Sequence, residues 1–119
     1  MPDLLVDTHA GVATLTFNRP DARNALSMEM RSMLRDTLHE VECDDSVRCV
    51  VIRGAGDHFM AGGDVKNMND YLSSHDAAET QSYFLHRIHD LHTIMYAMRR
   101  MPKPVVARVR GAAAGAGVS

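Results

Sequence analysis

A loop of small residues that directly follows an apolar run most limits the folds open to this chain. The run is Cys49–Ile52, and after a turn at residues 54–57 the sequence continues as HFMAGGD at residues 58–64. This pattern predicts a buried strand, then a loop with adjacent glycines, then a helix that begins near Asp64. Small residues let the backbone approach a ligand, and N–H groups at a helix start point outward as donors. Such a loop can hold a negatively charged oxygen without a side chain.

A second loop of the same kind closes the sequence. Residues 111–117 read GAAAGAG and follow another apolar run at residues 105–109. Two N–H groups, one from each loop, can converge on one oxygen and stabilise an enolate or a tetrahedral oxyanion. Either loop alone is a weak signal, because glycines also simply permit tight turns. Because two such loops occur and each follows a strand, the sequence favours a pair of N–H donors that bind one oxygen.

Hydrophobic periodicity predicts one α/β unit. Ser27 is a good N-cap for a first helix, and a turn at residues 9–11 joins the first two strands. The apolar stripe expected on the second long helix is Phe84, Leu85, Ile88, Leu91, Met95 and Met98. The expected elements are strands at residues 4–8, 12–17, 47–52 and 105–109, and helices at about residues 27–43 and 77–98.

Composition excludes several classes of protein. The 119 residues are 45% hydrophobic and 24% charged, which fits a single globular domain, and a net charge of −2 gives no reason to expect nucleic acid. No apolar run approaches the ~20 residues of a membrane span, and no signal peptide is apparent, so the cytoplasm is the expected location. Cys43 and Cys49 lack metal or redox spacing. His86, His89 and His92 spread over about 120° of their helix, too widely for a metal site.

Four ordered motifs give the sequence a family resemblance. They are Asn18-Arg19-Pro20, RNALS at residues 23–27, AGGDVK at residues 61–66, and Pro102–Val105 with the terminal glycine-rich loop. The chain closely resembles the N-terminal part of the crotonase superfamily, the enoyl-CoA hydratase/isomerase family. The resemblance covers essentially the whole chain but only about half of a typical member. It implies a crotonase-like ββα spiral, truncated after the fourth or fifth strand, with residues 1–119 as the N-terminal part of a single acyl-CoA-binding domain.

The resemblance also assigns roles to individual residues. Family members bind acyl-CoA thioesters and hold the thioester enolate with two backbone N–H groups, which match Gly63 and Ala116. Coenzyme A is part of the substrate, so no separate cofactor and no metal is implied. Arg23 and Lys66 would lie near phosphates, which suits their charge, although either could be a solvated surface cation. The positions that match those along coenzyme A are Arg23, Ala25, Ala61, Gly62, Asp64 and Lys66. Asp64 could instead cap a helix.

Ser119 favours an isomerase over a hydratase. Hydratases of the family place a glutamate at this position and a second one further on, because adding water requires groups that activate the water and manage the proton. A serine hydroxyl with no activating base is a poor substitute. The loop at residues 111–119 also resembles that of ring-epoxide and enoyl-CoA isomerases, which use an Asp or Glu located later in the sequence.

Other interpretations stay open. The chain could belong to an enoyl-CoA hydratase, or to a non-catalytic relative that only binds coenzyme A, and His58 could act as a base. A dinucleotide-binding oxidoreductase would need a third glycine and an acidic residue beyond Ser119. The 119-residue chain alone is expected to be inactive, because the acid/base residue and half of the fold are missing from it. A longer parent is expected to form homotrimers or hexamers, as the family does.

Overall fold

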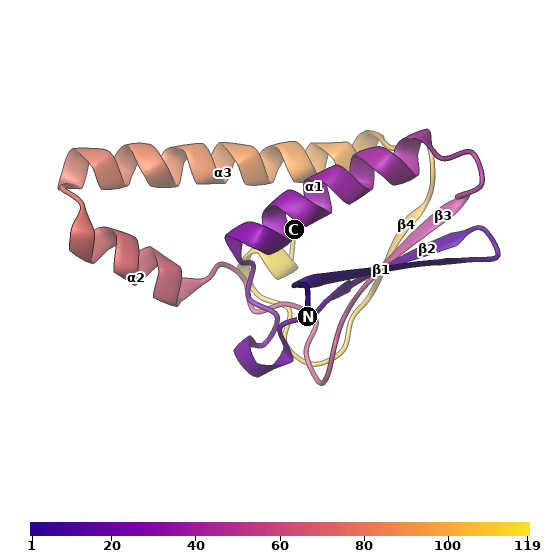
Figure 1. Cartoon of the computed structure of the whole chain (residues 1–119), viewed down its shortest axis with the longest axis horizontal. Helices are drawn as coiled ribbons and strands as arrows, with labels where there is room; N and C mark the ends of the chain where they lie inside the picture. Colours follow the sequence, from indigo (N-terminus) through magenta and orange to yellow (C-terminus); the bar gives the residue numbers. More distant parts are fainter.

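A computed structural model describes all 119 residues and shows one mixed sheet with helices packed on it (Figure 1). The sheet has the order β1-β2-β3-β4. The first two strands form an antiparallel hairpin, whereas β3 pairs parallel with both β2 and β4. Parallel neighbours require crossover connections, which the helices supply. The elements are β1 Leu4–His9, β2 Val12–Phe17, α1 Met28–Cys43, β3 Cys49–Gly54, α2 Val65–Ser74, α3 Ala77–Arg100 and β4 Val105–Arg108.

The predicted α/β class and the order of the four strands and two long helices are confirmed, and α2 is the helix expected to begin near Asp64, which the predicted order of elements did not include. The third strand begins at Cys49 instead of the expected residue 47. Val47 lies in the turn after α1, where its N–H donates to Asp44, yet its side chain is buried in the core. The apolar pattern there reflects burial and not strand pairing.

The core lies between one face of the sheet and helices α1 and α3. Ala13, Leu15 and Phe17 of β2 are buried together, as their alternation along the strand predicts. Helix α1 adds Met30, Leu34, Leu38 and Val41. Ile94 of α3 is fully buried in the same cluster.

The stripe expected on α3 is wrong in the N-terminal half of the helix. Leu85 and Ile88 are 52% and 51% exposed, and the buried residues of the helix are Thr80, Arg87 and Ile94. The N-terminal half of α3 extends with α2 beyond the sheet, so the sheet does not cover it (Figure 1). Periodicity alone could not reveal this, because it does not show where the sheet ends.

Side chains close the ends of the helices. Ser27 Oγ accepts the Met30 N–H at 3.0 Å, so the predicted N-cap of α1 is confirmed. At the other end of α1, Lys103 Nζ donates to the carbonyls of Val41 and Asp44 at 2.6 and 2.8 Å. This contact fixes the start of β4 to the end of α1 and places a cation at a helix C-terminus. None of the helices combines the length and apolar composition that a bilayer span requires.

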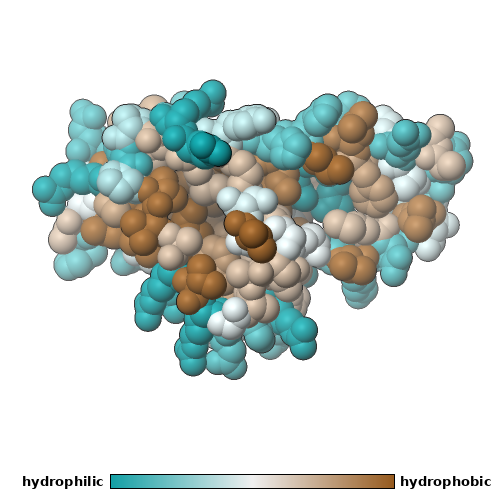
Figure 2. Space-filling view, turned by 180° about the vertical axis from the view of Figure 1, so that it is seen from behind, coloured by the Kyte–Doolittle hydropathy of each residue, from teal (hydrophilic) through white to brown (hydrophobic).

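Strand β4 forms an uncovered edge. It pairs with β3 on one side only. Val106, Val109 and Val118 are 50%, 56% and 74% exposed. Apolar side chains gather on the face turned away from the viewer in Figure 1, as Figure 2 shows. The last strand and the residues after it therefore leave apolar surface uncovered.

Two isoleucines of α3 test this assignment of the core. We expect Ile94→Ala to lower the free energy of unfolding by about 2–5 kcal/mol, because it removes a fully buried side chain. Ile88→Ala is the matched control and should change it by no more than about 0.5 kcal/mol, because Ile88 is half exposed. Urea unfolding followed by circular dichroism measures both. Equal effects of the two substitutions would contradict the packing of α3 described above.

Candidate active site

Three chain segments meet at one edge of the sheet. Strands β2, β3 and β4 run parallel, so the segments that follow their carboxyl ends emerge at the same edge. The segment after β2 joins the one after β3, since the Ala61 N–H donates to the Arg23 carbonyl at 3.0 Å and the Leu26 N–H to that of Gly62 at 2.7 Å. The segment after β4 joins them from the other side, since the Ala114 N–H donates to the Met60 carbonyl at 3.0 Å. The two glycine-rich loops are therefore neighbours.

Glycines allow the two loops to touch. Gly62 and Gly115 have φ angles of +106° and +54°, in the left-handed half of backbone space that favours glycine. A Cβ atom on Gly62 would lie 3.2 Å from the carbonyl oxygen of Ala114, and one on Gly115 would lie 3.4 Å from the Cα of Gly62. A side chain at position 62 would therefore press on the second loop, whereas one at position 115 would be strained mainly by the positive φ. Gly63 and Ala116 directly follow the two touching glycines.

The N–H groups of Gly63 and Ala116 are both free. Neither donates to another group of the chain, whereas the neighbouring N–H groups of Ala114 and Gly117 are hydrogen-bonded. Ala116 lies in a short 3-10 turn, Gly115–Gly117, whose first N–H groups have no partner within the turn. Two unused donors therefore stand on adjacent loops.

The buried side chain of Asn24 holds the segments in place. Its Nδ2 donates to the carbonyls of Ala55 and His58 at 2.9 and 2.7 Å, and its Oδ1 accepts the Arg19 N–H at 2.9 Å. Asn24 has a φ of +58°, which asparagine tolerates better than most residues. The sequence showed Asn24 only as part of a motif. Apart from the tolerance of asparagine for a positive φ, no local sequence pattern indicates that Asn24 holds these segments together.

His58 links the first loop to the second. Its Nδ1 accepts the Ala112 N–H at 2.9 Å, and its ring is half-buried. One ring nitrogen is thus engaged in holding the loops together. This contact gives His58 a structural role that the sequence did not indicate.

The residues matched to coenzyme A positions lie on or beside these segments. Ala25 and Ala61 are half-buried, Gly62 is buried, and Arg23 and Lys66 are exposed. Neither of these two cations forms an ion pair. Their placement is compatible with contact to phosphates.

Asp64 is the N-cap of α2, as one of the two interpretations of the sequence predicted. Its Oδ1 accepts the Asn67 N–H at 3.2 Å, and its Oδ2 lies 3.3 Å from Arg19 Nη1. This carboxylate follows Gly63 directly in the chain. Its contacts leave it poorly suited to acid–base chemistry.

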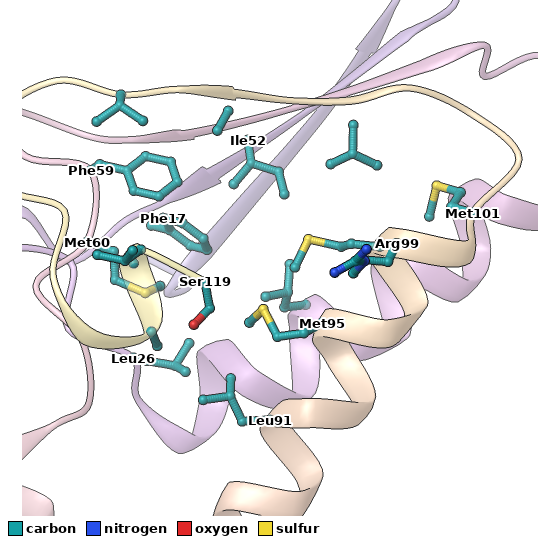
Figure 3. A pocket seen from close by; sticks show the side chains of 18 of the residues that line it. Phe17, Leu26, Ile52, Phe59, Met60, Leu91, Met95, Arg99, Met101 and Ser119 are labelled. Atoms are coloured by element: carbon teal, nitrogen blue, oxygen red, sulfur yellow. The ribbon is translucent and has the colours of Figure 1, made fainter.

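An apolar cavity of about 510 Å³ adjoins the second loop (Figure 3). The sheet and α3 form its walls, and Ser119 lies at its edge with a hydroxyl that makes no hydrogen bond. Among its lining residues are Phe17, Ile52, Leu91, Met95, Ala116 and Ser119. Its largely apolar lining suits an apolar ligand group.

The three histidines of α3 stay apart from the site. His86, His89 and His92 are all exposed. The His86 ring bonds the Ser82 carbonyl of its own helix at 2.8 Å. No group of three potential metal ligands occurs anywhere in the chain.

Asn24 provides a test of how the site is held. We expect Asn24→Ala to lower the free energy of unfolding by at least about 2 kcal/mol, because it leaves the buried carbonyls of Ala55 and His58 without donors. Asn69→Ala is the control, since the Asn69 side chain is exposed and makes no hydrogen bond. Hydrogen exchange at Ala61 should also accelerate in the first variant. Unchanged stability would show that Asn24 does not organise the loops.

Comparisons with known proteins agree with this architecture. A sequence profile of the enoyl-CoA hydratase/isomerase family matches residues 12–119. The 1,2-epoxyphenylacetyl-CoA isomerase of Escherichia coli is 35% identical over the whole chain, which covers 44% of that protein. An enoyl-CoA hydratase of Mycobacterium tuberculosis is 37% identical over 98% of this chain and 42% of its own.

The structural comparison gives the same result. The crystal structure of an enoyl-CoA hydratase/isomerase from Xanthobacter autotrophicus matches with a TM-score of 0.83 and 30% identity, over 97% of this chain and 41% of its own. The chain therefore spans less than half the length of these relatives. With a family profile over nearly its whole length and the same fold, the chain belongs to the crotonase, or enoyl-CoA hydratase/isomerase, family.

Proposed function

We propose that residues 1–119 form the N-terminal part of an acyl-CoA-binding domain in which the N–H groups of Gly63 and Ala116 bind the thioester oxygen. The observation that carries this proposal is the pair of unused donors on two touching loops. As the thioester becomes an enolate, negative charge develops on that oxygen. Fixed backbone donors stabilise this charge more strongly than water does, because they need no reorientation.

The exposed cations would bind the coenzyme A portion. Arg23 follows β2 and lies beside the first loop, and Lys66 lies in the first turn of α2. Both are free of ion pairs, so their charge is available to phosphate oxygens. The backbone near Ala25, Ala61 and Gly62 would then face the amide-bearing arm of coenzyme A.

We favour movement of a double bond, or opening of a ring epoxide, as the reaction. In the first case a base removes a proton from the acyl chain to give the enolate, and the same proton returns to another carbon. Only one base is needed, and Ser119 offers no carboxylate where a hydratase has one. The E. coli relative at 35% identity is an isomerase. The base would be an Asp or Glu outside residues 1–119.

Hydration is the second candidate, because the M. tuberculosis relative is a hydratase. It would require two further carboxylates beside the thioester, and Asp64 is already engaged. A relative that binds coenzyme A without catalysis is the third candidate. Membership in the family leaves the dinucleotide-binding oxidoreductase without support.

Two substitutions at Gly63 test the donor role in the protein expressed from its complete reading frame. Gly63→Pro removes the N–H and should lower kcat by about 10²–10³-fold, equivalent to about 2.7–4 kcal/mol of activation energy. Gly63→Ala keeps the N–H and should retain most of the activity. Its Cβ would meet only the terminal methyl of Met68, which can move. Thermal unfolding checks that both variants are folded, and a folded, fully active Gly63→Pro enzyme would refute the assignment.

Residues 1–119 expressed alone should show no turnover. The segment has the two donors but no free carboxylate beside them, and its apolar cavity and edge strand remain uncovered. We also expect such a segment to bind a hydrophobic dye, because apolar surface remains exposed. Isomerase and hydratase assays on the purified segment provide the measurement. Turnover above the rate of a Gly63→Pro control segment would contradict the proposed location of the base.

A further inference from the structure

Two arginines are buried where helices α1, α2 and α3 meet. Arg31 of α1 is 5% exposed and Arg87 of α3 is 6% exposed. Arg31 Nη1 donates to the backbone carbonyl of Arg87 at 3.0 Å. Arg87 Nη1 donates to Asn67 Oδ1 of α2, also at 3.0 Å. The buried face of α3 thus changes from apolar at Ile94 to cationic at Arg87.

No carboxylate neutralises these two charges. Neither arginine takes part in any ion pair of the structure. Asp90 is near Arg31 but is bonded to Arg35 at 2.8 Å. Burial, and next the neighbouring charge of Arg87, lower the pKa of Arg31. An arginine nevertheless keeps its proton in a protein, so both charges persist.

The junction also holds unused hydrogen-bond donors. Arg31 Nε, Arg87 Nε and Arg87 Nη2 are buried without a partner, and so is the hydroxyl of Thr80. Thr80 and Arg87 are seven residues apart and lie on one stripe of α3. Buried polar groups are almost always paired, and adjacent buried like charges without a counter-ion are strongly unfavourable. An anion would satisfy both the unused donors and the uncompensated charges, whereas water would satisfy the donors alone.

We propose that Arg31 and Arg87 form a receiving site for a carboxylate. The two oxygens of a carboxylate match the forked donors of a guanidinium group. Two sources supply this chemistry. One is a second carboxylate on the acyl group of the substrate. The other is an acidic side chain from outside residues 1–119, in the same protein or in a second copy.

The position of the junction favours the acyl group. Asn67, which holds Arg87, lies in the first turn of α2 and bonds Asp64, the residue after Gly63. Asn67 is thus close in the chain to Gly63, a proposed thioester donor, and this step rests on the proposed function. Tyr83 lines a shallow depression on the surface of α2 and α3, and its ring centroid lies 5.4 Å from the guanidinium carbon of Arg87.

The first experiment measures the affinity of the protein, expressed from its complete reading frame, for glutaryl-CoA and pentanoyl-CoA. These acyl groups have equal length, and only glutaryl carries a second carboxylate. We expect glutaryl-CoA to bind about tenfold more tightly, and we expect Arg31→Met and Arg87→Met to abolish this preference. Arg100→Met, which removes an exposed charge, should leave it unchanged. Failure to bind either compound would count against the proposed function, not against the arginine site.

If the protein shows no preference for glutaryl-CoA, a second experiment decides whether the carboxylate comes from the protein itself. A carboxylate of the protein itself would make Arg87→Lys melt at a higher temperature than Arg87→Met, because lysine retains the charge that the carboxylate needs. If Arg87 has no carboxylate partner, Arg87→Met should melt at a higher temperature than Arg87→Lys, because methionine brings no charge into the interior. The proposal is overturned if Arg87→Met is the more stable variant and glutaryl-CoA shows no preference. The comparison remains informative if both variants are less stable than the wild-type protein.

Discussion

The side-chain amide of Asn24 is the contact on which the candidate site depends. It satisfies the carbonyls of Ala55 and His58, which lie after β3 and would otherwise be buried without donors. Through its own acceptor it also fixes Arg19, at the end of β2. His58 continues the connection to Ala112, after β4. One line of hydrogen bonds thus joins the ends of three parallel strands, and the distance between the two glycine loops follows from it.

Most strands and helices could be predicted from the sequence, whereas the contacts between them could not. Strands and helices follow from local periodicity, and the pattern of small residues was enough to locate both loops. Their contact at Gly62 and Gly115 could not be predicted, because it depends on parallel pairing between segments far apart in the chain. The exposure of Ile88 was missed for the same reason, since it depends on where the sheet ends. The assignment of Gly63 and Ala116 came from the family resemblance, and the structure adds that their N–H groups are unused.

Arg31 and Arg87 show why the residues of the proposed carboxylate site escape recognition from sequence patterns. Charged residues on a helix are normally assigned to its solvent side. Arg87 lies on the same stripe as buried Ile94, a position that an apolar residue would usually occupy. Burial is what makes an unpaired guanidinium informative, because an exposed one would be satisfied by water. Only the packing of three helices reveals that these two charges lack a partner.

The buried polar side chains without partners lie where the three helices meet, and none lies in the hairpin. The free donors of Gly63 and Ala116, the apolar cavity beside Ala116, and the arginines at the junction of α1, α2 and α3 have no partner within residues 1–119. In the functions proposed above, each would be matched by a different part of one molecule: an enolate oxygen, an apolar body and a distal carboxylate. Asn67 lies in the first turn of α2 and bonds Asp64, the residue after Gly63, so in that proposal one acyl group would extend from the first loop to the arginines.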